Sequence, residues 1–591
     1  MMALYRLFNA RLLVGISLLV LLVASAACGG EDPTATVAPT AVVPATVAPA
    51  TVAPTAMAEP TTQPPADGMD RGQLNIALKE IGIFNANPGT AQYPGRSWIQ
   101  TAGFEGLSTL DIERVIRPQL AKEWSFSGDG LMWTIELQEG VQFHQGYGEM
   151  TAEDVIYSAH LQARDGARGP PQGRIINWVE GAKALDSHTI ELTTPKPQWD
   201  VIHWWMTPTG SSAWVISKTQ ADQGGEEALE SNGAGTGPWE IVEAIPAQFM
   251  RWKAVEDHWR KTPEFSELVL HEIGEESTRV ANFQTGKVDT MAMGFDSIPA
   301  VENVEGTKFM VQRGVGASSI YMLGQYYRGW GTPDQLPYYN PDLPWVASDP
   351  DLDSEGWERA KKVRQAMSLA IDRQLIIDTV LGGYASQIPA MWWAPFGGSE
   401  TRNTFQWESH WTWEHDPERA RELLAEAGYP DGFEVTITPA IRGAPGEVEA
   451  CEALLPMFEE VGIKAKFQRL PYSALSAQYR AYEVDGITCH ASHPFVNPLM
   501  GYAQVVKGVV GYDIPWLWEK IDEANATFDE TTRVDMTYEI AEWIWDDAMD
   551  IALYYVDYVY PLGPRIDEWT EHLKYADARL MSGLEYIPHR R

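Results

Sequence analysis

Three side chains that can bind a metal ion lie close together in the sequence Cys489-His490-Ala491-Ser492-His493. Thiolate and imidazole groups are good ligands for zinc, copper or nickel. A metal site usually takes a further ligand from another segment, and the sequence does not identify one. The cluster is therefore either a metal site or a loop that contacts a small molecule, and we expect no metal.

Other catalytic patterns are incomplete. His271-Glu272-Ile273-Gly274-Glu275 begins like a zinc-protease motif, but Glu275 stands where that motif requires a second histidine. Gly286-Lys287 is followed by Val288, whereas a phosphate-binding loop requires Ser or Thr there. Acidic pairs such as Asp546-Asp547 are common in so acidic a chain and do not indicate acid–base chemistry. The sequence predicts a protein that is not an enzyme and needs no cofactor.

The redox state of the two cysteines in the predicted folded body is open. Cys451 and Cys489 could form a disulfide in an oxidising compartment. Cys451 falls in a predicted helix and Cys489 follows a predicted strand, so the sequence does not give their separation. We expect two free, buried thiols.

The composition indicates a large, acidic, folded body. A chain of 591 residues is too long for one hydrophobic core, so two or three lobes are expected. The apolar content of 45% and the 24 tryptophans favour a folded protein over a disordered one, and most of these tryptophans are expected in the core. The formal net charge of −37 would repel nucleic acid and anionic lipid surfaces. We interpret it as the solvated surface of an exported protein.

The N-terminus has the organisation of an export signal. Two arginines precede the apolar stretch 12–23, which is too short for a comfortable permanent membrane anchor, so residues 1–27 are predicted to be a signal peptide. Small residues lead up to Cys28, as in a lipoprotein processing site, and Cys28 would become the acylated first residue. Ser25 stands where such sites usually have leucine. The alternative is an ordinary secretory signal with an incidental cysteine.

A low-complexity segment follows the signal. Residues 28–70 consist largely of Pro, Thr, Ala and Val, with a proline every few positions. Proline prevents both helices and sheet ladders, so we predict an extended linker that holds the folded body away from the lipid surface.

The stretch Pro118 to His160 has the most specific pattern of the chain. The short run Glu123–Phe126 ends at Ser127-Gly128-Asp129-Gly130, which is a turn-forming cluster. The following residues, LMWTIEL, are typical of the return strand of a hairpin. Thr151 stands three residues before Asp154 and an apolar run, which is the capping-box pattern that opens a helix.

This stretch resembles the family 5 extracellular solute-binding proteins of ABC importers, the peptide, dipeptide and nickel binding class. It carries nearly all of that family's pattern, P-x-LA-x-W-x-x-S-x-DG-x-x-WT-x-x-L-x-x-GV-x-FH-x-G-x-x-x-TAEDV-x-YS. The resemblance covers roughly Leu74 to Tyr560. Four further segments resemble the family as well: 101–111, 233–239, 276–290 and 358–383.

The resemblance implies the type II periplasmic-binding-protein fold, an α/β fold with two lobes, a hinge and an extra domain inserted in the first lobe. A parallel strand–helix–strand unit is predicted over 433–470, and an aromatic strand is predicted at the end of 540–561. The predicted boundaries are 71–110, 236–315 and 540–591 for lobe I, 111–235 for the inserted subdomain, and 316–539 for lobe II.

The resemblance also implies where a solute would bind. The cluster at 489–493 falls where peptide binders of the family have a G-W-x-x-D-Y loop, whose aspartate neutralises the amino group of the peptide. His493 lies close to that aspartate's position, and the loop here contains no acid. The predicted solute contacts are Glu80, Phe104, Trp392, Trp393, His490, His493 and Tyr555.

The predicted function is that of the extracytoplasmic solute-binding component of an ABC importer. Its lobes would close on a peptide-like or oligosaccharide solute and deliver it to a membrane permease. The alternatives are a metal-chelate binder of the nickel type, a secreted lipoprotein hydrolase, and a sensor or chaperone without an importer. The protein is expected to be a monomer anchored by lipid on the outer side of the cytoplasmic membrane, with no nucleic-acid partner.

Overall fold

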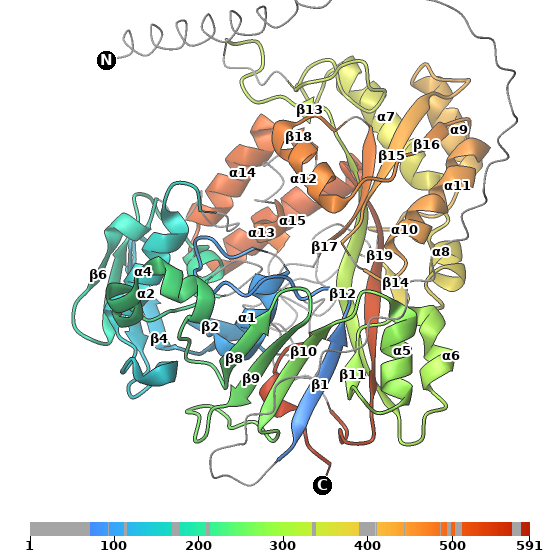
Figure 1. Ribbon diagram of the computed structural model, residues 1–591. Helices are drawn as coiled ribbons and strands as arrows, with labels where there is room; N and C mark the ends of the chain where they lie inside the picture. Colours follow the sequence, from blue (N-terminus) through green and yellow to red (C-terminus); the bar gives the residue numbers. More distant parts are fainter. Residues whose placement is uncertain are drawn as a thin grey trace, which may run out of the picture. The chain divides into compact units, whose positions relative to one another are not determined.

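Two long antiparallel strands, β12 (Lys308–Met322) and β19 (Asp550–Leu562), run side by side through the largest sheet of the computed structural model (Figure 1). Their register extends from Lys308 opposite Leu562 to Tyr321 opposite Asp550. Every residue of β19 except Asp557 is buried. Aromatic and β-branched side chains suit a strand that is covered on both faces, and the predicted aromatic strand near the C-terminus is confirmed.

The structure describes residues 71–92, 94–111, 115–167, 177–207, 213–333, 338–388, 408, 410–442, 444–484, 486–492, 498–502, 511–569 and 581–590. The predicted signal peptide, Cys28 and the predicted linker lie outside these residues.

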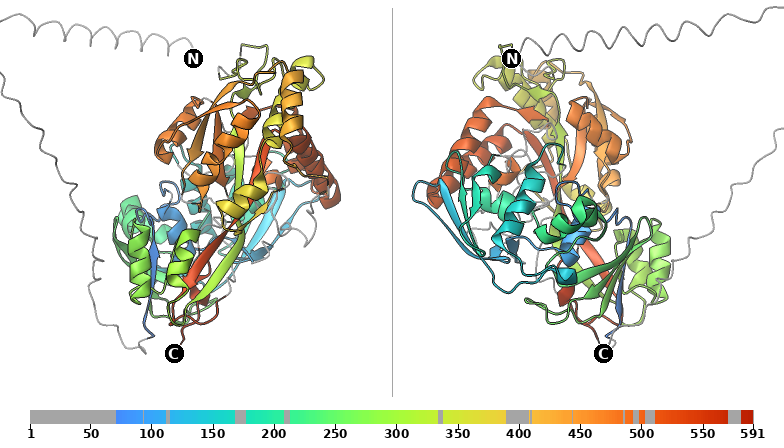
Figure 2. Two further views of the ribbon diagram at one scale, coloured as in Figure 1. Left: turned by 90° about the vertical axis from the view of Figure 1, so that its right-hand side faces the viewer. Right: turned by 60° about the vertical axis from the view of Figure 1, so that its left-hand side comes forward.

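Parallel strands flank the β12–β19 pair on both sides. On one side β1 pairs in parallel with β10 and β11, and on the other side β15 pairs in parallel with β16 and β17. The order along the sheet is β16-β15-β17-β12-β19-β11-β1-β10-β9-β8, with β14 paired to β19. Both parallel groups are therefore joined through β12 and β19, which remain adjacent in the two views of Figure 2. The strand bounds are β1 Gln73–Leu78, β8 Trp239–Ile245, β9 Phe249–Ala254, β10 Glu267–Glu272, β11 Thr290–Met291, β14 Ala385–Gln387, β15 Glu434–Ala440, β16 Lys464–Phe467 and β17 Ile487–Ser492.

Helices cross between the parallel strands. Two short helices, α10 and α11, lie between β15 and β16, so the predicted parallel strand–helix–strand unit is confirmed, although its helix is interrupted at Ala453. At the start of α9, the Asp416 carboxylate accepts a hydrogen bond from Arg419 N at 2.9 Å, and Pro417 is the first helical residue. The helices of this sheet are α5 Glu276–Gln284, α6 Ile298–Val301, α7 Glu355–Leu369, α8 Arg373–Thr379, α9 Pro417–Glu426, α10 Glu447–Glu452, α11 Leu454–Glu460, α12 Tyr472–Ala481, α13 Pro498–Tyr502, α14 Pro515–Ala526 and α15 Glu530–Asp546.

A separate four-stranded sheet is formed within the range predicted for the inserted subdomain (Figure 1). The predicted hairpin is confirmed as an antiparallel pair, and the capping box is confirmed by the hydrogen bond from Thr151 N to Asp154 Oδ2 at 2.9 Å. The second oxygen of Asp154 accepts from Lys218 N at 2.8 Å and so ties two helices together. The elements are β4 Ala121–Phe126, β5 Met132–Leu137, β6 Ala182–Ala184, β7 Thr189–Thr193, α2 Ala152–Ala163 and α4 Lys218–Asn232.

The remaining regular elements are short. Two small pairs are β2 (Ser108–Leu110) with β3 (Ile116–Pro118), and β13 (Gln325–Tyr326) with β18 (Tyr512–Asp513). Helix α1 spans Gly95–Gly103, and the glycine-containing segment 233–239, one of those that resemble the family, approaches its C-terminal end.

That segment packs against the end of α1. A Cβ atom on Gly235 would lie 2.0 Å from Gly103 O, so only glycine fits there. His144 N donates a hydrogen bond to Gly235 O at 2.9 Å, and the His144 ring contacts Gly237 O at 2.8 Å. These glycines therefore serve backbone packing.

Candidate functional site

Two of the predicted solute contacts lie on one face of the central sheet. His490 of β17 is directly opposite Ser319 of β12, and Tyr555 of β19 is opposite Ala317. Residues that are directly opposite share a face, and positions two apart on a strand share it too. The sheet therefore brings His490 and Tyr555 to the same face, although the sequence separates them widely. Both side chains are buried.

His490 is held between an aromatic ring and a cation. Its ring stacks on Tyr321 at a centroid distance of 4.9 Å and an interplanar angle of 27°. Arg442 Nη1 lies 3.0 Å from His490 Nε2. Because a guanidinium only donates hydrogen bonds, His490 Nε2 is the acceptor and the ring proton is on Nδ1.

Arg442 is the cationic group of this face. It follows the carboxyl end of β15 and is only partly buried. Its Cζ lies 5.2 Å from the centroid of the Tyr472 ring, which is a cation–π distance. Arg442 is not among the solute contacts predicted from the sequence. Its position just past a parallel strand was the available signal, since ligands bind at the carboxyl ends of such strands.

Asp550 places a carboxyl group on the same face. It is opposite Tyr321, is 5% exposed, and accepts a hydrogen bond from the Tyr512 hydroxyl at 2.7 Å. Within the described residues, Asp550 Oδ1 has no hydrogen-bond partner. Burial raises the pKa of Asp550 to about 7, against the opposing effect of the Tyr512 hydrogen bond. Asp550 is not among the predicted contacts either, because no sequence feature distinguishes it from the other acidic residues among the 81 of the chain.

The described part of the chain reaches this face at Ile388, four residues before the predicted tryptophan pair. Ile388 packs in one buried cluster with Ala317, Ala552 and Tyr555. Trp392 and Trp393 follow closely but lie outside the described residues. His493 also lies outside them, directly after Ser492, which pairs with Ala317.

The other two predicted contacts lie on different elements. Glu80 is exposed and lies just beyond β1, which is separated from β12 by β19 and β11. Phe104 is buried after α1, with its ring centroid 6.1 Å from that of Trp214. The structure therefore groups His490 with Tyr555 but does not group them with Glu80 or Phe104.

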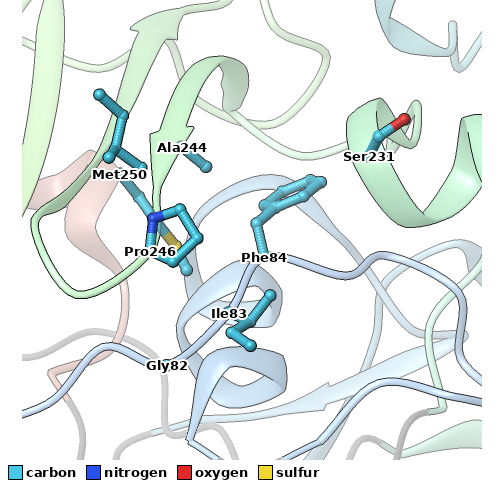
Figure 3. A pocket seen from close by; sticks show the side chains of 8 residues that line it. Gly82, Ile83, Phe84, Ser231, Ala244, Pro246 and Met250 are labelled. Atoms are coloured by element: carbon cyan, nitrogen blue, oxygen red, sulfur yellow. The ribbon is translucent and has the colours of Figure 1, made fainter.

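One pocket with an empty volume of about 460 Å³ lies near Glu80 (Figure 3). Ile83, Phe84 and Met250 point into it, and no charged side chain lines it. A pocket without charges offers nothing to orient a charged solute. We do not assign the solute site to it.

The prediction of two free thiols is wrong, because Cys451 and Cys489 form a disulfide with a Cα–Cα distance of 5.9 Å. The reason is the sheet order. β17 pairs with β15, and α10, which carries Cys451, packs over both strands. A disulfide removes the Cys489 thiolate as a metal ligand. Among the described residues, no group of three or more His, Cys, Asp and Glu side chains could hold a metal ion.

Two further sequence interpretations can be compared with the structure. His271 lies on strand β10, not on a helix, and its Nε2 is 3.0 Å from Asn75 Oδ1, so it has no zinc-protease geometry. Core packing is confirmed for seven large tryptophan side chains, all nearly inaccessible to solvent: Trp133, Trp214, Trp239, Trp252, Trp345, Trp357 and Trp411.

The fold and the site together define a binding protein with two α/β groups of strands joined by long central strands. The sequence model of the bacterial extracellular solute-binding proteins, family 5, matches residues 115–505. The chain therefore belongs to this family. It is 25% identical over 406 residues to the glutathione-binding protein GsiB of Shigella flexneri, an alignment that covers 68% of this chain and 69% of the relative.

Solved structures show the same fold. The periplasmic binding protein DppA of Helicobacter pylori, in complex with the peptide STSA, superposes with a TM-score of 0.66 at 19% identity and covers 86% of this chain and 97% of its own. NikZ of Campylobacter jejuni, in complex with Ni(L-His), gives a TM-score of 0.65 at 18% identity and covers 87% of this chain and 98% of its own.

Membership of the family fixes the class of function. The chain is an extracytoplasmic solute-binding protein of the ABC-importer type and is not an enzyme. The predicted periplasmic-binding-protein fold is confirmed. Within the part of the chain that the structure describes, no helix has both the length and the apolar character needed to cross a membrane.

Proposed function

We propose that this protein captures a peptide-like solute that carries a carboxylate, and that Arg442 binds this carboxylate. The observation that supports the proposal is the partly buried Arg442 guanidinium beside His490 and over the Tyr472 ring. A guanidinium presents several donors in a plane and matches the geometry of a carboxylate.

The surrounding groups fit an organic solute. Tyr321, Tyr472 and Tyr479 all have ring centroids within 6.4 Å of the His490 centroid. Aromatic rings contribute apolar contact area and can stack on peptide planes or side chains. A short peptide would place its carboxylate at Arg442 and its apolar groups along these rings.

Capture would proceed by closure of two lobes. The lobe boundaries remain those inferred from the sequence, with lobe I at 71–110, 236–315 and 540–591, the inserted subdomain at 111–235, and lobe II at 316–539. β12 and β19 connect the two groups of parallel strands, so bending within these strands is the motion that the fold permits. A solute that contacts both lobes stabilises the closed form by its differential affinity for it.

Delivery requires that the protein stay near its permease. The signal 1–27, an acylated Cys28 and the linker 28–70 would tether a monomer to the outer side of the cytoplasmic membrane. In a Cys28→Ala variant the protein should move from the membrane fraction to the soluble extracytoplasmic fraction. Retention of that variant in the membrane fraction would show that lipid on Cys28 is not the anchor.

Calorimetry tests the solute assignment. The probes are reduced glutathione, the tetrapeptide Ser-Thr-Ser-Ala and the nickel–histidine complex, and native mass spectrometry of the purified protein screens for a co-purified solute. Replacing Arg442 by Ala should weaken binding of the peptide probe by about tenfold to a hundredfold, since hydrogen bonds to charged groups contribute this much. Arg442→Lys should be intermediate.

Arg421→Ala is the matched control. Arg421 is exposed, and within the described residues its guanidinium donates a hydrogen bond to the Glu460 carbonyl. It should bind like the unmodified protein. Binding of the nickel–histidine complex alone would replace the peptide proposal by the metal-chelate alternative. Equal peptide affinity in Arg442→Ala and the unmodified protein would refute the role of Arg442.

A further inference from the structure

A second contact links the inserted subdomain to the helical part of lobe II, away from the His490 face. It is made by the end of α14, the turn 527–529 and the start of α15. Asp529 caps α15 by accepting a hydrogen bond from Thr532 N at 2.9 Å. This cap fixes the end of the turn, so Phe528 just before it is held in a defined direction.

Phe528 packs into the turn of the β4–β5 hairpin. Its ring centroid lies 4.7 Å from that of Phe126 and 6.0 Å from that of Trp133. A Cβ atom on Gly130 would lie 2.3 Å from the Phe528 ring. The glycine of the hairpin turn therefore leaves the space that this aromatic ring fills.

A second patch lies beside the first. The Arg533 guanidinium carbon is 4.0 Å from the centroid of the Trp199 ring, and Trp199 N donates a hydrogen bond to Asn525 O at 2.9 Å. At the rim, Lys196 Nζ and Asp522 Oδ2 form an exposed ion pair at 3.1 Å. Three kinds of interaction thus connect segment 196–199 with the same helical turn.

We propose that this contact, which we call the clasp, is a second closure point that forms when the lobes close and stabilises the closed state. The clasp consists of Phe126, Gly130, Trp133, Lys196 and Trp199 on the inserted subdomain and of Asp522, Asn525, Phe528 and Arg533 on the helical turn. The role in closure rests on the proposed clamp function.

The surface properties of the clasp suit a reversible contact. The centre of the clasp is buried at Trp199 and Arg533, whereas its rim stays in solvent: Phe126 is 48% exposed even in contact, and the Lys196–Asp522 pair is exposed on both sides. A permanent core contact would exclude solvent from these groups. The two sides belong to chain segments far apart in sequence, so a hinge motion between the lobes would separate them without breaking a strand.

The experiment uses the mature chain without solute. In Phe528→Ala, hydrogen exchange of segments 124–133 and 194–200 should accelerate by about tenfold or more, since loss of a packed ring shifts the docked equilibrium by at least this factor. The radius of gyration from small-angle X-ray scattering should rise. Phe467→Ala, at a partly buried position on β16, is the matched control and should change neither quantity.

A charge-swap series keeps the test decisive if Phe528→Ala is poorly folded. Lys196→Asp should accelerate exchange of segment 194–200, and the double variant Lys196→Asp with Asp522→Lys should restore it. Unchanged exchange and unchanged radius in Phe528→Ala and Lys196→Asp would overturn the clasp. A lower melting temperature with unchanged radius would assign Phe528 to ordinary core packing and would overturn it too.

A solute arm separates the clasp from the proposed function. If reduced glutathione or Ser-Thr-Ser-Ala binds, Phe528→Ala should weaken its affinity by about tenfold through a faster dissociation rate. If no probe binds the unmodified protein, the solute assignment fails. The exchange and scattering results still decide whether the clasp exists.

Discussion

Two buried carboxylates, Glu105 and Asp550, have very different surroundings. Glu105 is fully buried, and Arg260 Nε donates to it at 2.8 Å while Trp259 Nε1 donates at 3.0 Å. Arg260 also bonds the fully buried Glu585 at 2.7 Å, near the C-terminus. Asp550 is also buried, but the donor that it meets in the described residues is the neutral Tyr512 hydroxyl.

The difference separates a carboxylate bonded to a cation from one whose donor in the described residues is neutral. A buried charge with a bonded counter-ion is compensated, whereas a buried carboxyl with a neutral partner shifts its pKa instead. The pKa of Asp550 is raised to about 7 by burial. Glu105 thus joins distant chain segments, while Asp550 sets a pH-dependent charge on the candidate solute face.

The largest effect is expected when the Glu105 cluster is broken. Arg260→Met leaves two buried carboxylates without their cation and should lower the free energy of unfolding by roughly 3–5 kcal/mol. Denaturant unfolding followed by tryptophan fluorescence measures this change. Lys218→Met is the control, because it breaks an exposed pair with Asp222 and should leave the free energy of unfolding nearly unchanged. A small effect of Arg260→Met would remove the contrast between the two carboxylates.

Replacing Asp550 should have a smaller effect of opposite sign, an increase in the free energy of unfolding. A carboxyl whose folded-state pKa is raised binds more protons when folded, so its contribution to stability falls as pH rises from about 4 to beyond 7. Asp550→Asn should remove this pH dependence and raise the free energy of unfolding above pH 7 by roughly 2–4 kcal/mol. Unfolding curves at pH 5 and pH 8 measure it. An unchanged pH profile would show that Asp550 is compensated.

The smallest effect concerns the hydrogen bond to Asp550. Tyr512→Phe removes a donor that favours the ionised carboxylate, so the pKa of Asp550 should rise further. The free energy of unfolding at pH 8 should fall by about 1–2 kcal/mol and should change less at pH 5. If Asp550→Asn is introduced first, Tyr512→Phe should lose this pH dependence.

The candidate site could be predicted only in part. The strand that carries Tyr555 was indicated by the sequence pattern, whereas His490, which was expected in a loop after a strand, lies inside β17. Glu80 and Phe104 were expected from the resemblance, and they lie on other elements, just beyond β1 and just after α1. Arg442 and Asp550 carry its charges; Arg442 could have been noticed from its place just past β15, whereas no local pattern distinguishes Asp550 from the other acidic residues.

The sequence by itself determined the local elements. The Ser127–Gly130 turn, the Thr151 capping box and the Asp416-Pro417 helix start depend on side-chain and backbone preferences within a few residues, so they can be recognised without the fold. The resemblance to the family then predicted the architecture in which these local elements are arranged, the periplasmic-binding-protein fold.

Only the tertiary structure decided which distant groups meet. The Cys451–Cys489 bond spans 38 residues, the Arg442–His490 contact spans 48, and the hydrogen bond from Tyr512 to Asp550 spans 38. Each depends on the strand order β15-β17-β12-β19 or on the elements packed against it. Strand order is set by the sum of long-range packing, which no short segment encodes.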